Sequence, residues 1–214
     1  MSFEPLNISE IHNLVSPIVE TLLKNEGFEN TSNLKWVRCQ NEPVRQIFEL
    51  LQWKGGMVAP RISISLDFVP HVSGSSVKWH RTTKSAQPDM IFDVYDRSIE
   101  FPYHKGEAAI VEKAPLAILA AIEKAKEFWA TCAYEHQLLQ AFDKLKNYYD
   151  KDLPEGRSKF RMFVPHELAL SFVLARGGQA IEALNLFELN AERFKYKPKV
   201  TERLRALLTE SMNI

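Results

Sequence analysis

The residues best suited to chemistry lie in one segment, where a tryptophan, a histidine and an arginine precede several carboxylates. They are Trp79, His80, Arg81, Asp89 and Asp93, with Asp96 just beyond. A histidine near an aspartate can act as a general base, and an arginine can hold an anion. We therefore treat the first five residues as a candidate site for a ligand or partner, and we assign no catalytic residue.

A structural role is the simpler interpretation of the same segment. Successive side chains of a strand point to opposite faces, so Trp79 and Arg81 share one side while His80 points away. This predicts a packed tryptophan beside a surface ion pair, with His80 exposed. Replacing His80 by alanine would then leave stability almost unchanged.

The sequence contains no nucleotide-binding glycine loop and no nucleophile motif. His71, His80 and His104 match no known ligand spacing, so we expect neither a metal nor a cofactor. His166 follows a proline at a predicted helix start, where the helix dipole disfavours a cation, and we expect it to be neutral and solvent-facing. Cys39 and Cys132 lack Cys-x-x-Cys spacing and are expected to be buried thiols.

One basic segment is interleaved with aromatic residues. Its members are Lys144, Lys146, Lys151, Arg157, Lys159 and Arg161, with Tyr148, Tyr149 and Phe160 between them. The segment could contact phosphate or an acidic partner. Acidic residues intersperse it, however, which favours a solvated face of mixed charge. Phe128, Trp129 and Tyr134 are at helical spacing and are expected in the core.

Composition excludes some classes of protein. The 27 basic and 27 acidic residues give no net charge, which argues against nucleic-acid binding. No apolar run is long enough for a membrane helix, and residues 1–5 do not resemble a secretory signal. We therefore expect a cytoplasmic protein with no membrane contact.

The elements that position these residues begin with the run from Arg61 to Phe68, which alternates polar and apolar side chains. It predicts a strand with one buried and one solvated face. Short turns separate predicted strands at 34–39, 44–53 and 61–69 and favour antiparallel pairing. The strand at 44–53 is apolar on both faces and is expected at the centre. Two shorter strands are expected at 91–95 and 98–101.

Helices are predicted on both sides of this sheet in the sequence. Asn7 and Glu10 form a possible capping box, and the first helix should end at Gly27. From Pro115 onward the pattern is helical, with a break near Thr131. Further helices are expected at 138–149, 165–177 and 179–194, and from residue 198 to the end of the chain.

These elements define an α+β fold. We expect an antiparallel sheet of about five strands with the N-terminal helix on one face, followed by an all-helical C-terminal portion. Residues 1–150 would form the α+β domain and residues 151–214 a helical extension packed on it, or both would belong to a single domain. In the hairpin at 165–194, Ser171 and Leu174 in the first helix, Gly178 in the turn, and Ala183 and Phe187 in the second helix stand where a tetratricopeptide-type repeat has small or aromatic residues. The hairpin resembles one such repeat, and a lone repeat should pack on the rest of the protein.

Several short motifs follow the order of a known family. They are Gly27-Phe28 after the first helix, Trp36, Leu51-Gln52-Trp53-Lys54, Trp79-His80-Arg81, and Asp89 followed by aromatic residues. Over roughly residues 10–150 this order resembles the bacterial domain-of-unknown-function family 4304. The chain has Ile91-Phe92 where that family has a Trp-Trp pair. The resemblance implies a bacterial, cytoplasmic α+β domain and carries no settled activity.

Two kinds of function remain open. The first is a non-enzymatic protein-binding or regulatory module, with an immunity-like role suggested by the family context. The second is a small-molecule-binding or enzymatic domain with a pocket between the sheet and the helices. The first predicts an exposed apolar patch, and the second requires His80 and an acid within hydrogen-bond reach in a concave pocket.

Overall fold

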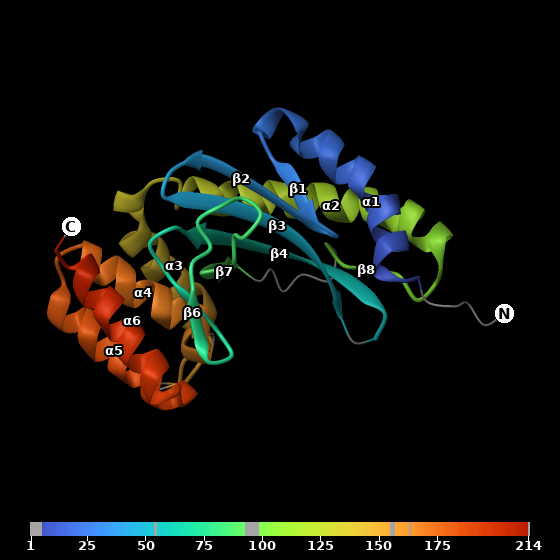
Figure 1. Ribbon diagram of the computed structural model, residues 1–214. Coiled ribbons are helices and arrows are strands. Elements are labelled where there is room, and N and C mark those ends of the chain that lie inside the picture. Colours follow the sequence, from blue (N-terminus) through green and yellow to red (C-terminus); the bar gives the residue numbers. More distant parts are fainter. Residues whose placement is uncertain (1–5, 54, 93–98, 155–156, 163, 214) are drawn as a thin grey trace.

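The protein has an α+β fold, seen in a computed structural model that describes residues 6–53, 55–92, 99–154, 157–162 and 164–213 (Figure 1). The strands are β1 (Glu29–Ser32), β2 (Lys35–Asn41), β3 (Val44–Trp53), β4 (Met57–Leu66), β5 (His71–Ser73), β6 (Ser76–Lys78), β7 (Met90–Phe92) and β8 (Phe101–Pro102). The helices are α1 (Ile8–Leu23), α2 (Glu107–Ala130), α3 (Leu138–Asp150), α4 (Val164–Arg176), α5 (Ala180–Phe194) and α6 (Pro198–Ser211). Short 3₁₀ turns at Lys24–Glu26, Glu135–Gln137 and Phe160–Met162 connect some of them.

The main sheet is antiparallel, with strand order β1-β2-β3-β4-β7, and β8 pairs with the far end of β4. This confirms the predicted antiparallel sheet and the central position of β3. The sequence pattern did not reveal β1 or the hairpin β5–β6, which are short and mostly polar. The predicted strand at 91–95 is described only as far as Phe92, and that at 98–101 is reduced to β8.

Helices α1 and α2 cover one face of the sheet (Figure 1). The predicted capping box is present: Asn7 Oδ1 accepts from Ser9 N at 3.0 Å, and the Glu10 carboxylate accepts from Asn7 N at 2.7 Å. Ile11, Val15 and Val19 recur on one side of α1 and are fully buried. The helical segment ends at Gly27, whose φ of 76° fits a left-handed cap.

Helix α2 begins at Glu107 and not after Pro115, so the predicted start was wrong. Pro115 is exposed, while Ile110 and Ala114 on the opposite side are fully buried, so packing holds the helix together despite one lost backbone bond. The predicted break is confirmed, because Thr131 caps the helix.

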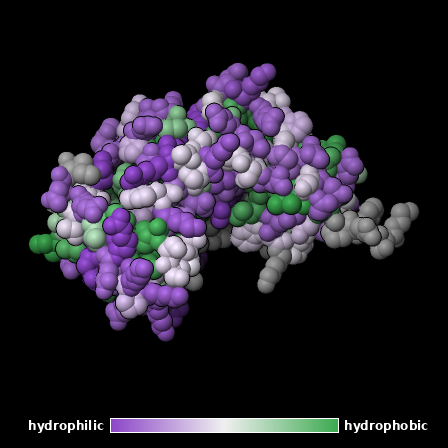
Figure 2. Space-filling view, viewed as in Figure 1, coloured by the Kyte–Doolittle hydropathy of each residue, from purple (hydrophilic) through white to green (hydrophobic). Residues whose placement is uncertain are grey.

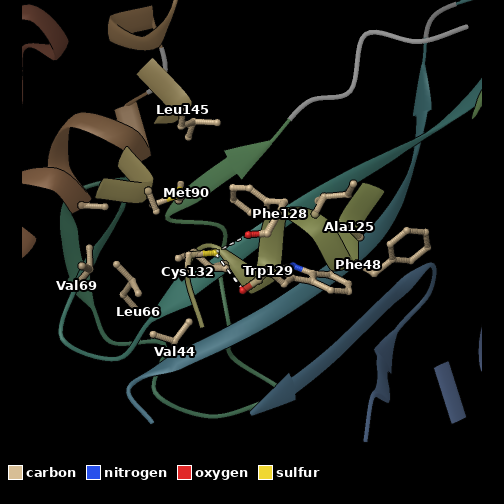
Figure 3. Close-up of a cluster of buried hydrophobic side chains, with 14 of the residues drawn as sticks. Val44, Phe48, Leu66, Val69, Met90, Ala125, Phe128, Trp129, Cys132 and Leu145 are labelled. Carbon is tan, nitrogen blue, oxygen red and sulfur yellow. Dashed lines mark hydrogen bonds between the residues drawn. The ribbon is translucent and has the colours of Figure 1, made fainter. Parts of the chain in front are cut away.

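The C-terminal end of α2 contributes to the core shown in Figure 3. The Cys132 thiol lies there and donates to Phe128 O at 3.4 Å, and burial raises its pKa to about 12. Cys39, also expected to be buried, is exposed because it lies near the end of β2 on the face away from α1 and α2. Trp129 is buried as expected, whereas Tyr134 is half exposed because it follows the helix in a surface turn.

The opposite face of the sheet was predicted to be solvated, and this prediction was wrong. Ser63 and Ser65 of β4 are fully buried. Residues 79–89, which we call the strap, run across them: Ala86 packs on Val37 and Ile47, and Gln87 N donates to Ser65 Oγ at 3.3 Å. Alternation in a strand identifies its two faces, but it does not say whether an irregular segment covers the polar one.

The C-terminal helices pack at one end of the sheet and are tied to its edge strand, β7 (Figure 1). Ile91 N donates to His166 Nε2 at 2.9 Å, and Tyr149 Oη donates to Ile91 O at 3.1 Å. His166 is therefore buried, contrary to the solvent-facing position predicted, and burial lowers its pKa to about 4 and keeps it neutral. The buried core is continuous from Ile11 in α1 to Leu208 in α6. The domain boundary at residue 150 stays a prediction.

Candidate ligand-binding site

The strap, β5, β7 and the C-terminal helices border an open pocket of about 550 Å³, which we call the interlayer pocket. Its lining consists of Arg61, Pro70, His71, Val72, Gln87, Pro88, Asp89, Ile91, Pro165, Leu168, Phe194 and Tyr196. Seven of these twelve side chains are apolar, and all of the polar ones except Gln87 are ionisable. This combination is typical of small-molecule sites.

Asp89 supplies the carboxylate of this lining, and only 3% of its surface is exposed. Its Oδ2 atom accepts from Leu66 N at 2.6 Å and forms a hydrogen bond with His80 Nε2 at 2.7 Å. Its backbone N donates to Ile64 O at 2.8 Å, so Asp89 fastens the strap to β4. Burial raises the pKa of Asp89, and the bond to His80 opposes that rise. Oδ1 takes no part in these bonds.

Two histidines stand beside this carboxylate. The ring centroids of His71 and His80 are 5.7 Å apart. Among the described residues, Nδ1 of each ring is buried without a hydrogen-bond partner. His71 lines the pocket, and burial, together with the charges of His80 and Lys78, lowers its pKa. A neutral His71 can either donate or accept a hydrogen bond there.

Tyr196 contributes a hydroxyl group from the chain segment after α5. The hydroxyl is buried and has no partner within the described part of the chain. Burial, and then the charge of Glu167, raises the pKa of Tyr196 to about 12, so the phenol stays protonated. Glu167 itself is held by Arg193 Nη1 at 2.7 Å, and Arg61 is bound to Glu49 Oε2 at 2.7 Å. The charges around the pocket are therefore paired, while neutral donors and acceptors remain.

The structure brings together two of the predicted site residues, His80 and Asp89, and separates two others from them. Trp79 and Arg81 lie on the other side of the strap, with the Arg81 guanidinium 3.6 Å from the Trp79 ring centroid. Arg81 Nε also donates to Asp67 O at 2.9 Å. Asp93 and Asp96 lie outside the described residues.

Residues 79–81 follow β6 without forming a strand, so the strand on which the prediction depended is wrong, and the exposures of Trp79 and His80 are the reverse of those predicted. Trp79 is 37% exposed, and His80 is 1% exposed. A histidine is easily buried once a carboxylate satisfies one ring nitrogen, and Asp89 does this for His80. Trp79 is instead stacked under a charged guanidinium at the surface.

Several lining residues escaped sequence reasoning. Arg61, Leu168, Phe194 and Tyr196 come from β4, α4 and α5 and from the segment after α5, and no local spacing relates them. His71 drew attention only as a metal candidate. Within the described ranges no group of three His, Cys, Asp or Glu side chains is arranged to hold a metal ion.

Comparisons with known proteins returned no match: none among protein-family models, curated proteins or solved structures. The resemblance to family 4304 and to a tetratricopeptide hairpin therefore stays a prediction. Among the described residues, no helix combines the length and apolar character needed to cross a bilayer.

Proposed function

We propose that this protein binds a small, planar, uncharged molecule in the interlayer pocket. The observation that carries the proposal is the set of neutral polar groups beside apolar walls. His71 and Tyr196 each have a buried polar atom without a described partner, and Asp89 stands beside them. The aromatic ring of Phe194 and three prolines supply flat apolar surface. A heterocycle or aryl amide offers both a donor and an acceptor to such a lining.

Binding is favoured over catalysis by the position of His80. The histidine that could act as a base is bonded to Asp89 through Nε2 and does not belong to the pocket lining. A general base must come within hydrogen-bond distance of the proton it removes. Asp89 also accepts a hydrogen bond from a backbone N–H of β4, and this bond holds the strap on the sheet. These bonds position the lining and leave His80 out of reach of a ligand.

The test compares nicotinamide with nicotinate by saturation-transfer difference NMR. The two molecules have the same ring, but nicotinate is an anion, and the buried Asp89 carboxylate in the pocket lining should repel it. We expect saturable binding of nicotinamide and at least tenfold weaker binding of nicotinate, about 1.4 kcal/mol. Equal affinities for the two, or no saturable binding of either, would contradict the proposal.

A blocking variant locates the binding. Gln87 is exposed at the pocket mouth, so Gln87→Trp should close the pocket without disturbing the core. Gln140→Trp on α3 is the matched control, because Gln140 is also exposed and lies outside this lining. We expect nicotinamide binding to be lost in the first variant and kept in the second. Equal behaviour of the two variants would place any binding elsewhere.

A second candidate function is protein binding, which one feature of α2 supports. Val111, Leu116 and Leu119 of α2 are exposed, Leu116 at 74%. Leu116 and Leu119 are three residues apart and are neighbours on the helix surface, and Val111 lies farther round the helix, so the three form a broad exposed apolar area, which we call the α2 stripe. The face drawn in Figure 2 is mainly hydrophilic with small separate apolar patches, and α2 runs behind the sheet in that view (Figure 1).

The partner that suits this stripe is an amphipathic helix of another protein. The test is chemical cross-linking in lysate of the source organism, comparing the wild type with Leu116→Glu and with Leu189→Glu, an exposed leucine on α5. A defined partner lost only in Leu116→Glu would support this function. Self-association of the purified chain, or identical cross-links in all three proteins, would contradict it. A bacterial origin, a cytoplasmic location and an immunity-like role rest on the family resemblance and remain part of this second proposal.

A further inference from the structure

A second hollow lies between α2 and α3, away from the interlayer pocket. This α2–α3 groove has a volume of about 450 Å³. Its residues are Phe92, Lys124, Glu127, Phe128, Thr131, Ala141, Lys144, Leu145 and Tyr148. It shares no residue with the interlayer pocket, so the two can be tested independently.

Aromatic rings form the apolar surface of the groove. Phe92 at the end of β7 stacks on Phe128 of α2, with centroids 5.1 Å apart and planes at 10°. Tyr148 of α3 meets Phe92 at 5.1 Å with its plane tilted by 54°. Ala141 and Leu145 complete the surface between them. A flat aromatic ligand can stack on such a surface.

Among the described residues, two lysines and one acid line the groove. They are Lys124 of α2, Lys144 of α3 and Glu127 of α2. Lys151 lies just beyond, with Nζ 5.9 Å from the centroid of the Tyr148 ring. Lys144 forms no ion pair with any described residue. An anionic group beside Lys144 would therefore meet favourable charge, while the interlayer pocket would not favour it.

We infer that the α2–α3 groove binds a planar aromatic carboxylate of one or two rings. The ligand rings lie against the apolar surface that Phe92, Phe128 and Tyr148 form together, and the carboxylate lies toward Lys144. The basic segment interleaved with aromatic residues that the sequence shows would then contribute one lysine and one tyrosine to a ligand site. Tyr149 and Phe160 of that segment are buried in the core, and Tyr148 and Lys144 open onto the groove.

The probe is 2-naphthoate, titrated against the intact protein and followed by its fluorescence. We expect saturable binding that weakens as ionic strength rises, and weaker binding of the uncharged 2-naphthamide. Tyr148→Ala should weaken 2-naphthoate binding about tenfold, and Tyr134→Ala, which removes an exposed tyrosine outside the groove, should not.

Charge is tested with a pair of lysines on α3. Lys144→Glu should weaken 2-naphthoate about fivefold or more, because it places a negative charge at the rim. Lys146→Glu changes the net charge equally but lies outside the groove, and should have a smaller effect. Thermal melting of each variant checks that it is folded, and Lys144 and Lys146 are both exposed.

Several results would overturn the inference. They are the absence of saturable binding, equal effects of Lys144→Glu and Lys146→Glu, and binding insensitive to Tyr148→Ala. Loss of 2-naphthoate binding in Gln87→Trp would place the probe in the interlayer pocket and would also overturn it. If 2-naphthoate binding is kept in Gln87→Trp and lost in Tyr148→Ala, the result supports the groove, and it does so independently of the outcome of the nicotinamide test.

Discussion

The two faces of the sheet are both buried, but they are built from different chemistry. The face under α1 and α2 is apolar, with Trp36, Phe48 and Ile62 in register across three strands. The face under the strap is polar, and Lys35, Glu49 and Arg61 form an ion-pair ladder across the same strands. Regular helices bury the first face, whereas an irregular segment held by specific hydrogen bonds covers the second.

This difference decides where a site can form. The apolar face is filled by packed side chains, and a hollow forms on that side only at its margin, where Phe92 of β7 lines the α2–α3 groove. The strap carries backbone and side-chain polar groups that only specific partners can satisfy, and some of them remain unsatisfied at the interlayer pocket. The pocket therefore lies on the polar side, beside the elements that hold the strap in place.

The largest effect is expected on the apolar face. Phe48 is fully buried, so Phe48→Ala should lower the free energy of unfolding by about 3 to 5 kcal/mol through lost burial and the cavity left behind. Urea unfolding followed by circular dichroism measures this. Phe48→Leu should cost much less. A loss below about 1 kcal/mol in Phe48→Ala would mean that the two faces do not differ in this way.

The edge that joins the sheet to the C-terminal helices should respond to acid. In the folded protein the pKa of His166 is lowered to about 4, from 6.5. Below pH 6.5 His166 binds a proton in the unfolded chain but stays neutral in the folded protein until about pH 4. The free energy of unfolding should therefore fall by roughly 3 kcal/mol between pH 7 and pH 4. The measurement is urea unfolding across this range. His166→Gln, which can still accept from Ile91 N, should reduce the dependence, and an unchanged profile would count against this role.

The hydrogen bonds that fasten the strap come next. Asp89→Ala leaves Leu66 N and His80 without their acceptor and should cost about 2 to 3 kcal/mol. Hydrogen exchange should then be faster in residues 79–89 than in α1. Asp89→Asn keeps one acceptor and should be milder, and the exposed Asp152→Ala is the control. His80→Ala, expected from sequence to be harmless, should also be destabilising because His80 is buried.

The smallest effect distinguishes two neighbouring serines on the polar face. Ser63 Oγ is buried and has no described partner, so Ser63→Ala should be neutral or stabilising by up to about 1 kcal/mol. Ser65 Oγ accepts from Gln87 N, so Ser65→Ala should destabilise by about 1 kcal/mol. Melting temperatures compare the pair. The reverse order would contradict the proposed attachment of the strap.

Local sequence determined most of the secondary structure of this protein. The capping box at Asn7 and the turn at Gly178 act over a few residues, and both lie where the sequence predicts them. The apolar content of β3 on both faces correctly predicted its central position. Such features depend on backbone conformation and side-chain period, which neighbouring residues fix.

Only the tertiary structure decided which polar side chains are buried. Ser63, His80 and His166 look like surface residues in sequence, yet each is buried by a segment distant along the chain. The pocket combines β4, the strap and the C-terminal helices, and no periodicity relates these elements. Whether a polar residue is buried depends on a partner that satisfies it, and here those partners, such as Asp89 for His80, meet it only when the chain has folded.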